Sequence, residues 1–167
     1  SLESLKQAVA ELGLPIVLKT VTGGYDGKGQ FVLRSEDQID TAWAELGPAK
    51  SLIAESFVKF SREVSIIAVR GQDGDVKTWA LAENHHHNGI LSHSIVPAPN
   101  STDLQPVAQD YITRLLNHLN YVGVLTLELF VTEQGLYANE MACRVHNSGH
   151  WSIEGAICSQ FEIHIRA

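Results

Sequence analysis

Cysteine, cationic clusters and long apolar runs are all scarce in this chain of 167 residues. The two cysteines, Cys143 and Cys158, do not have metal-ligand spacing, and their small number predicts a reducing, cytoplasmic setting. Lysine and arginine number 12 against 19 acidic residues, and the net charge of −7 argues against a nucleic-acid partner. No apolar run reaches the length of a membrane span, so we expect no membrane partner. The N-terminal segment also lacks the cationic start and cleavage site of a signal peptide.

The hydrophobic residues, 44% of the chain, are numerous enough to form a core. Their periodicity predicts an α+β fold in which strands are in the majority. We expect helices at residues 1–13, 36–46, 103–119 and from 153 towards 167, the second capped by Ser35. We expect strands at residues 16–20, 30–34, 52–55, 63–70, 76–82, 90–96, 124–131 and 136–141. A βαβ-like first part gives way to an antiparallel sheet near residues 55–62, which predicts two lobes, 1–60 and 61–167.

Two glutamates occupy neighbouring predicted strands near the end of the chain. Glu128 and Glu140 flank a turn at Gln134 and Gly135, and a hairpin closed there places them roughly opposite each other on one face. Two carboxylates at such a short separation repel each other, and their burial without a partner costs several kcal/mol. Because Mg2+ commonly binds one or two carboxylates together with nucleotide phosphates, a magnesium ion removes this conflict. Asn139 adds a neutral oxygen beside the pair.

A dense polar run follows the second glutamate in a glycine-containing loop. It contains Arg144, His146, Asn147, Ser148 and His150. No packing role calls for so many hydrogen-bond donors, so the run predicts an active site. We do not expect Ser148 to be a nucleophile, because no nucleophile elbow surrounds it.

A glycine-rich loop at residues 22–30 joins two of the predicted strands. Its glycines leave backbone amides free to approach phosphate oxygens, and Lys28 supplies a positive charge. The loop lacks the spacing of a P-loop, so we expect a flexible hairpin lid. An ordinary hairpin with Asp-Gly turn chemistry accounts equally well for the glycines. Lys19, a charge within an otherwise apolar strand, favours the phosphate-binding interpretation.

Two weaker signals lie between these regions. The apolar strand that runs into residues 55–58 offers backbone groups for an adenine edge, although a solvated glutamate at a strand end is the commoner explanation. The three consecutive histidines at 85–87 invite a zinc interpretation. Adjacent strand residues point to alternate faces, and no cysteine lies nearby, so we expect a polar loop in which one histidine faces the site.

Several segments together resemble the ATP-grasp region of the 5-(carboxyamino)imidazole ribonucleotide synthase family, the ATPase subunit of phosphoribosylaminoimidazole carboxylase. They are GGYDGKGQ, AE-x-FV-x-F-x-REVS, EN-x-H-x-x-GIL, YVGVLTLELF and NEMACRVHNSGHW. They occur in the family's order and cover essentially the whole chain. The RVHNSGHW run is specific to this branch, whereas paired glutamates are general to ATP-grasp enzymes. The resemblance implies two lobes of mostly antiparallel sheet with helices packed on one face, the lid in the first lobe and the metal and bicarbonate site in the second.

The same resemblance implies roles for individual residues. Nucleotide contacts would come from Lys19, Gly24, Tyr25, Asp26, Gly27, Lys28, Gly29, Gln30, Glu55, Ser56, Phe57, Val58, Glu63, His86, Asn139 and Glu140. Within this set the lysines would contact phosphates, residues 55 and 58 would frame adenine, and residue 63 would bind the ribose hydroxyls. Mg2+ would lie between Glu128 and Glu140. The catalytic residues would be Lys28, Arg144, His146 and Asn147, with Tyr25, Asp26 and Ser148 near the ribonucleotide.

The implied activity is that of an ATP-dependent ligase of purine (IMP) biosynthesis, with ATP and Mg2+ as cofactors. Bicarbonate would become carboxyphosphate, and the 5-amino group of aminoimidazole ribonucleotide would capture the carboxyl group. His146 is the expected proton acceptor, because histidine is the residue type whose charge state changes near neutral pH.

Two departures from the family pattern bear on activity. Cys143 stands where the family usually has proline, which would loosen the turn that aims Arg144. The N-terminal ribonucleotide-binding lobe and the C-terminal segment of the family are absent from this chain. Whether the chain is active by itself is therefore left open. Formation of a homodimer also stays open. The alternatives are another ATP-grasp carboxylate–amine ligase and a catalytically silent nucleotide-binding or assembly domain.

Overall fold

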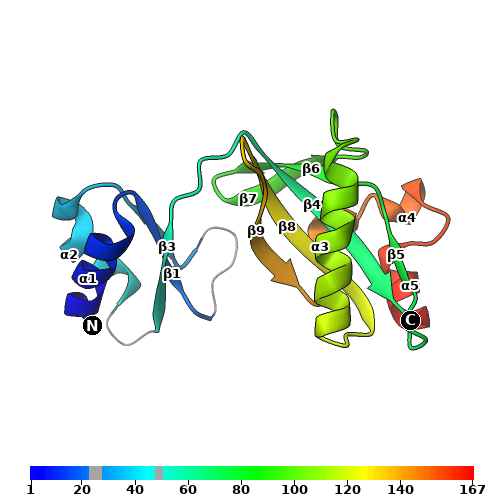
Figure 1. The fold of residues 1–167 in the computed structure, drawn as a ribbon, viewed down its shortest axis with the longest axis horizontal. Coiled ribbons are helices and arrows are strands. Elements are labelled where there is room, and N and C mark those ends of the chain that lie inside the picture. The colour runs from blue at the N-terminus through cyan, green and yellow to red at the C-terminus, as the bar shows by residue number, and fades with distance from the viewer. Residues whose placement is uncertain (23–27, 48–50) are drawn as a thin grey trace. The chain divides into compact units, whose positions relative to one another are not determined.

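A computed structural model describes residues 1–22, 28–47 and 51–167 of the chain. The chain divides into two compact units, residues 1–59 with 88–90, and residues 60–87 with 91–167 (Figure 1). Each unit has its own sheet and its own buried core. The predicted α+β class is therefore confirmed.

The described residues of the first unit form a three-stranded sheet and two α-helices. Its elements are α1 (Leu2–Leu12), β1 (Ile16–Thr20), β2 (Gln30–Leu33), the 3-10 helix η1 (Glu36–Gln38), α2 (Ile39–Leu46) and β3 (Leu52–Ser56). Strand β1 lies in the middle and is antiparallel to both neighbours. Strands β2 and β3 therefore run parallel to each other with α2 in the connection, which explains the βαβ-like pattern of the sequence. The buried core consists of Leu5, Val9, Ile16, Leu18, Leu33, Ile39, Ala42 and Leu46.

The helix boundaries of the first unit include one confirmed and one wrong prediction. Helix α1 ends at Gly13 as expected, where a φ of 72° suits glycine. Ser35 does not cap the second helix, because a 3-10 turn precedes α2 and the Ser35 side chain makes no capping hydrogen bond. Instead, the Gln38 side chain accepts a hydrogen bond from the Arg34 backbone N–H at 2.8 Å.

The second unit is built on a six-stranded sheet. Its strands are β4 (Arg62–Arg70), β5 (Val76–Thr78), β6 (Ala82–His87), β7 (Ile90–Ile95), β8 (Gly123–Thr132) and β9 (Gly135–Ala142). The order is β7-β6-β4-β8-β9, and β5 pairs with the last residues of β4. Strand β4 is antiparallel to β5, β6 and β8, and β8 is antiparallel to β9.

Two strand predictions need correction in this unit. The strand expected over residues 76–82 is interrupted at 79–81, because Leu81 N–H donates to the Gln105 side chain at 2.7 Å and Leu81 C=O accepts from Ala98 N–H at 2.7 Å. The histidine run expected as a polar loop forms the end of β6, which begins by pairing with β4. Residues 82–84 pair with β4, and β7 is the other neighbour of β6, so backbone pairing forms this strand although most of its side chains are polar.

Helix α3 (Leu104–His118) covers one face of the second sheet (Figure 1). Its Ala108, Ile112 and Leu116 share a core with alternate residues of two strands, namely Val64, Ile66, Ala68, Leu125, Leu127 and Leu129. Because successive strand residues point to opposite faces, the residues between these on β4 and β8 point away from α3.

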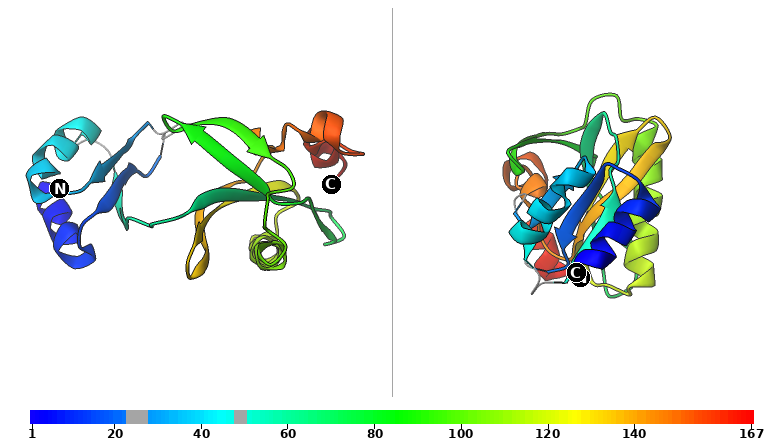
Figure 2. Two further views of the ribbon diagram at one scale, coloured as in Figure 1. Left: turned by 90° about the horizontal axis from the view of Figure 1, so that it is seen from above. Right: turned by 90° about the vertical axis from the view of Figure 1, so that its left-hand side faces the viewer.

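Three short helices follow β9: η2 (Asn147–Gly149), α4 (Ser152–Gly155) and α5 (Gln160–Arg166). The single helix expected after residue 152 is therefore split, because Ser159 starts a new helix by accepting a hydrogen bond from Glu162 N–H at 3.2 Å. Ile163 of α5 packs near Ile67 and Val124. Helix α5, the red ribbon of Figure 2, lies on the side of the sheet opposite α3. Within the described ranges, no helix is long and apolar enough to cross a membrane.

Candidate active site

The face of the second sheet opposite α3 carries polar side chains from three neighbouring strands. Glu63 and Ser65 lie two residues apart on β4, and Asn84 and His86 lie two residues apart on β6, so each pair is on one face of the sheet. Glu128 lies on β8. Antiparallel pairing places Ser65 beside Glu128 and Glu63 beside Asn84. This register brings five side chains from three distant segments of the sequence onto one face.

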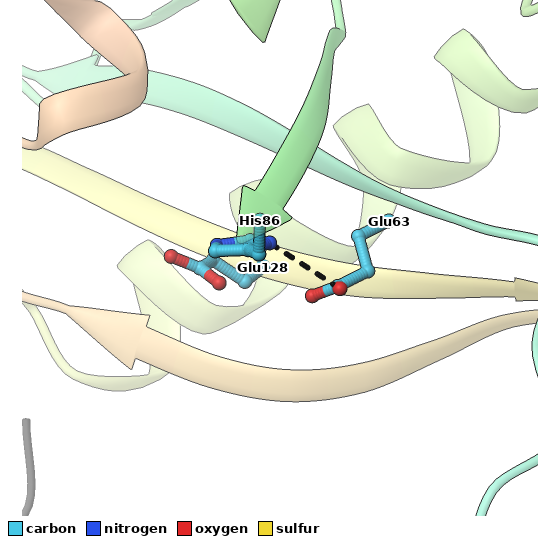
Figure 3. A group of neighbouring side chains, drawn as sticks. All are labelled: Glu63, His86 and Glu128. Atoms are coloured by element: carbon cyan, nitrogen blue, oxygen red, sulfur yellow. Dashed lines mark ion pairs between the residues drawn. The ribbon is translucent and has the colours of Figure 1, made fainter. Parts of the chain in front are cut away.

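Three of these side chains lie close enough together to hold a metal ion (Figure 3). One ligand atom from each of Glu63, His86 and Glu128 lies within 4.8 Å of the others. His86 Nδ1 is 3.3 Å from Glu63 Oε1. The hydrogen bond with Glu63 raises the pKa of His86, burial opposes this increase, and the charges of the two glutamates add to it. His86 therefore tends to carry a positive charge between two carboxylates.

Glu128 has a second partner in the loop after β9. Its Oε1 lies 2.9 Å from His146 Nε2, and the two side chains are only 16% and 13% exposed. Burial acts to raise the pKa of Glu128, but the hydrogen bond with His146 and the charges of His146, His86 and Arg144 outweigh it, and the pKa falls below its ordinary value. Glu128 is therefore ionised at neutral pH.

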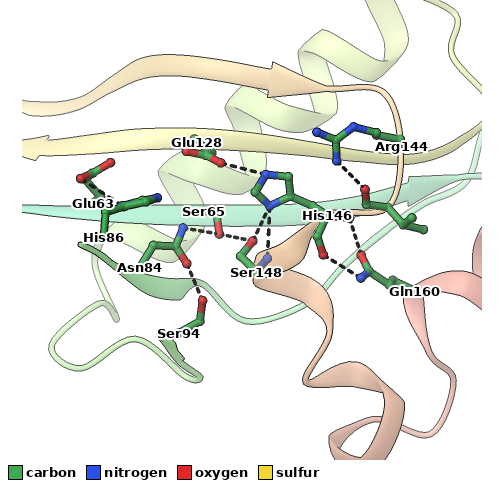
Figure 4. A network of polar contacts seen from close by, with 11 residues as sticks. Glu63, Ser65, Asn84, His86, Ser94, Glu128, Arg144, His146, Ser148 and Gln160 are labelled. Carbon is green, nitrogen blue, oxygen red and sulfur yellow. Dashed lines mark hydrogen bonds and ion pairs between the residues drawn. The ribbon is translucent and has the colours of Figure 1, made fainter. Parts of the chain in front are cut away.

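A buried chain of hydrogen bonds leads from β6 to His146 (Figure 4). Ser94 Oγ donates to Asn84 Oδ1 at 2.8 Å, and Asn84 Nδ2 donates to Ser65 Oγ at 2.9 Å. Ser65 Oγ donates to Ser148 Oγ at 2.8 Å, and Ser148 Oγ lies 2.9 Å from His146 Nδ1. Asn84, Ser65 and Ser148 are at most 5% exposed, so these contacts are shielded from bulk water.

Gln160, at the start of α5, holds the loop that carries His146 (Figure 4). Its Oε1 accepts from His146 N–H at 2.9 Å, and its Nε2 donates to His146 C=O at 2.7 Å. Gly149 packs closely against it, because a methyl group at this glycine would lie 2.7 Å from Gln160 Cδ and 2.6 Å from Ile67 Cδ1. The glycine of the polar run is therefore required for close packing of the loop.

The predicted register of the two paired glutamates is confirmed, since Glu128 and Glu140 are partners on β8 and β9. The register shifts after Glu128, because Leu129 pairs with Ala138, and Asn139 is the extra residue of a β-bulge. Glu140 is exposed, and the three-residue group of Figure 3 does not include it. The two carboxylates therefore have different environments.

Other residues of the polar run lie at the surface. Arg144 and Asn147 are exposed, and Arg144 Nη1 donates to Val145 C=O at 2.9 Å. The Tyr121 hydroxyl donates to Cys143 C=O at 2.9 Å. This hydrogen bond anchors the turn before Arg144 at the position where the family usually has proline.

In the first unit, Lys19 Nζ pairs with Glu55 Oε2 at 2.7 Å. Lys19 lies on β1 and Glu55 on β3, two register positions apart on the same face. Gly29 C=O accepts a hydrogen bond from Thr20 N–H at 2.8 Å, and Gln30 begins β2.

The segment expected to frame adenine continues from β3. Ser56 ends this strand, Phe57 N–H donates to Pro15 C=O at 3.2 Å, and Val58 is half-buried. The Arg34 guanidinium lies 5.5 Å from the Phe57 ring centroid, a cation–π contact. Lys28 lies within the described residues; the expected lid residues outside them are Gly24, Tyr25, Asp26 and Gly27.

The consecutive histidines show the alternation that the sequence predicts. His86 contributes to the cluster with Glu63, whereas the ring of His85 stacks on His93 with centroids 4.4 Å apart. The side chains of the adjacent residues His85 and His86 therefore lie on opposite faces of β6.

Three polar residues of the site escaped the sequence analysis: Ser65, Asn84 and Gln160. The alternation of Glu63 and Ser65 in an otherwise apolar strand was an available signal that one face is polar. Asn84 fell in a segment expected to be a loop. No sequence pattern pointed to Gln160, which follows its partner His146 by 14 residues.

The fold and this site define a class of protein that comparison with known families identifies. The model of the ATP-grasp domain matches residues 1–161, and the chain belongs to the ATP-grasp family. The predicted ATP-grasp fold is therefore confirmed.

Within this family the chain is similar to N5-carboxyaminoimidazole ribonucleotide synthases. The enzyme of that name from Pseudomonas aeruginosa is 53% identical over 163 residues, which are 98% of this chain and 44% of the relative. The Bacillus subtilis enzyme is 52% identical over 164 residues, 98% of this chain and 43% of the relative. The crystal structure of the Aspergillus clavatus synthase with ADP and 5-aminoimidazole ribonucleotide has a TM-score of 0.91 at 31% identity, covering 100% of this chain and 43% of that one.

These matches confirm the resemblance that the RVHNSGHW run indicated. The chain spans less than half the length of the relatives that it matches, with a coverage of 44% for the Pseudomonas aeruginosa enzyme.

Proposed function

We propose that this chain is the nucleotide-binding and metal-binding part of an ATP-dependent N5-carboxyaminoimidazole ribonucleotide synthase. MgATP phosphorylates bicarbonate, and the 5-amino group of aminoimidazole ribonucleotide takes up the carboxyl group. The observation that carries this proposal is the ionised Glu128, held by His146 beside Glu63 and His86 on one sheet face. Solved relatives described as complexes with ATP, with ADP, and with ADP and ribonucleotide support the same assignment.

The donors on this face fit Mg2+, which prefers carboxylate oxygens and phosphate oxygens. We assign Glu128 and Glu140 as its protein ligands, with the bulge residue Asn139 beside them. The lowered pKa of Glu128 supports this assignment, because the ligand must be ionised. Bound there, the ion would neutralise charge on the ATP phosphates.

We assign the nucleotide contacts residue by residue. Lys19 and Lys28 supply charge for the phosphates, and residues 55–58 frame the adenine. The lid is assigned to residues 24–30, of which 24–27 lie outside the described residues. Glu63 binds the ribose hydroxyls, and His86 faces the nucleotide. The first lobe of this proposal is residues 1–60 and the second is residues 61–167.

The chemistry requires positioning and charge neutralisation more than covalent participation. A bicarbonate oxygen attacks the γ-phosphorus of ATP while the bond to the ADP oxygen breaks. The amino nitrogen then attacks the carboxyl carbon of carboxyphosphate, inorganic phosphate leaves, and the nitrogen loses a proton. Arg144 and Asn147, exposed next to His146, offer donors for the bicarbonate oxygens, and Lys28 offers charge for the transferred phosphoryl group.

The experiment is ADP formation by this chain with ATP, Mg2+, bicarbonate and aminoimidazole ribonucleotide, each omitted in turn. Bicarbonate should accelerate ADP formation, and acetate or formate at the same concentration should not. Acceleration by another carboxylate but not by bicarbonate would identify a different ATP-grasp ligase. Failure to bind ATP would contradict the proposal as a whole.

A further inference from the structure

We propose that Ser148, Ser65 and Asn84 are positioning residues that hold His146 as a hydrogen-bond donor to Glu128. No role was given to Ser65 or Asn84 above, and the family resemblance placed Ser148 only near the ribonucleotide. The catalytic consequence rests on the proposed function, whereas the protonation pattern of the His146 ring does not.

The direction of the hydrogen-bond chain is set at its first end by Asn84. Its amide nitrogen only donates, and the Ser94 hydroxyl, which donates to Asn84 Oδ1, keeps that nitrogen directed at Ser65. Ser65 Oγ accepts this bond and gives its own hydrogen to Ser148 Oγ. The Ser148 hydroxyl therefore retains one hydrogen for a further partner.

The other end is set independently by the backbone. Ser148 N–H donates to His146 Nδ1 at 3.3 Å, and an N–H group cannot accept. In the neutral ring this contact makes Nδ1 the nitrogen without hydrogen, and Ser148 Oγ, 2.9 Å from the same atom, can donate its remaining hydrogen to it. Neutral His146 then carries its hydrogen on Nε2, which donates to Glu128 Oε1 at 2.9 Å. Both ends give the chain the same direction.

Burial makes this direction hard to reverse. Ser65 and Ser148 are 0% and 1% exposed, so a hydroxyl that turned away would lose its partner without gaining water. The His146 nitrogen nearest Glu128 is consequently a donor. In the proposed reaction His146 orients Glu128, and proton acceptance at Nε2 requires the ring form that the serine chain disfavours.

The test is nitrogen NMR of the 167-residue chain labelled with 15N-histidine, at about pH 9, where imidazoles are neutral. His146→Gln assigns the His146 signals. In the unaltered chain, Nε2 should carry the hydrogen and Nδ1 should show the shift of a hydrogen-bonded acceptor. In Asn84→Asp, a carboxylate accepts where the amide donated, so both serine hydroxyls should turn towards it. The ratio of the Nε2–H to the Nδ1–H form should then fall at least about fivefold, the equivalent of one neutral hydrogen bond.

Ser65→Ala is the second variant, and it decides the test if Asn84→Asp does not fold. This variant interrupts the series of hydrogen bonds without altering a direct partner of His146. The Nδ1 signal should therefore move towards that of a free acceptor. Ser159→Ala is the matched control. It removes a serine hydrogen bond at α5 that is not part of this hydrogen-bond series, so the signals of both His146 nitrogens should stay unchanged.

Two results would overturn the proposal: a hydrogen on Nδ1 in the unaltered chain, or unchanged His146 signals in folded Asn84→Asp and Ser65→Ala. ATP binding and ADP formation are measured separately, so failure of the proposed function is distinguishable from failure of this inference.

Discussion

The two faces of the second sheet use the same strands for different purposes. On the face covered by α3, Val64, Ile66 and Leu125 are buried among other apolar side chains. On the opposite face, the neighbouring residues Ser65 and Glu128 belong to a polar network. Strand alternation thus lets one pair of strands, β4 and β8, anchor the core and present chemistry at adjacent positions.

This difference predicts which property of the protein a substitution on each face should change. Apolar residues under α3 stabilise the fold through burial, so their truncation should lower the free energy of unfolding. Ser65 and Glu128 on the opposite face have specific hydrogen-bond partners, so their isosteric replacement should alter binding or protonation while the fold persists.

Leu125→Ala should have the largest effect on stability. Leu125 is 0% exposed beneath α3, and its truncation leaves a cavity that should lower the free energy of unfolding by about 2–5 kcal/mol. Urea denaturation measures this loss. Ile153→Ala is the matched control, because Ile153 is 55% exposed and should change stability by less than about 0.5 kcal/mol. Equal losses in both variants would contradict the assignment of the core.

Gly149→Ala should follow with a loss of about 1–3 kcal/mol from overpacking. The added methyl group meets Ile67 and Gln160, and displacement of Gln160 disturbs the loop that carries His146. Thermal and urea unfolding measure the loss, and the histidine NMR spectrum shows whether the His146 signals move. A variant as stable as the parent, with unchanged signals, would show that this loop accommodates a side chain.

Glu63→Gln should reveal a pH-dependent contribution of less than about 1 kcal/mol. Glu63 raises the pKa of His86 above its ordinary value, so the charged pair stabilises the folded state below that value. This contribution is lost as pH rises through the raised pKa. Urea unfolding of parent and variant should therefore differ most near about pH 6 and least near about pH 9. A difference that stays constant over this range would exclude His86 as its source.

Thr126→Val should have the smallest effect and the opposite sign. Among the described residues, the buried Thr126 Oγ1 has no hydrogen-bond partner, so an apolar side chain of the same shape should be neutral or stabilising by up to about 1 kcal/mol. Ser65→Ala is the contrasting control, since Ser65 makes two hydrogen bonds on the same face and its loss should destabilise. A substantial loss of stability in Thr126→Val would indicate a partner for its hydroxyl.

Local patterns predicted much of the fold, because apolar alternation and turn residues act over a few positions. The predicted turn correctly joined the two strands that carry Glu128 and Glu140, and it pairs Thr132 with Gly135. Continued without interruption, that register would place Glu128 opposite Asn139, so the exact pairing of Glu128 with Glu140 depends on the bulge. The bulge at Asn139 has no comparable local signal.

The missed parts depend on contacts that are distant in the sequence. Ser65 meets Ser148 across 83 residues, and neither residue type alone indicates a buried hydrogen bond. Strand β6 was missed because its side chains are polar, whereas its backbone pairs with β4 from the distant segment around Glu63. The sequence therefore indicated the charged residues of the candidate site, whereas the neutral residues Ser65, Asn84 and Gln160 were missed.

The most direct test of the central claim is calorimetric titration of ATP into this chain, with Mg2+ and with EDTA. Glu128→Gln removes one charge at nearly constant volume, and Glu133→Gln does the same at an exposed turn position. Mg2+ should strengthen ATP binding at least about tenfold, or 1.4 kcal/mol, in the parent and in Glu133→Gln. Glu128→Gln should lose this enhancement and remain folded. ATP binding that is independent of Mg2+ in the parent, or a full enhancement in Glu128→Gln, would contradict the role of this sheet face as the metal and nucleotide site.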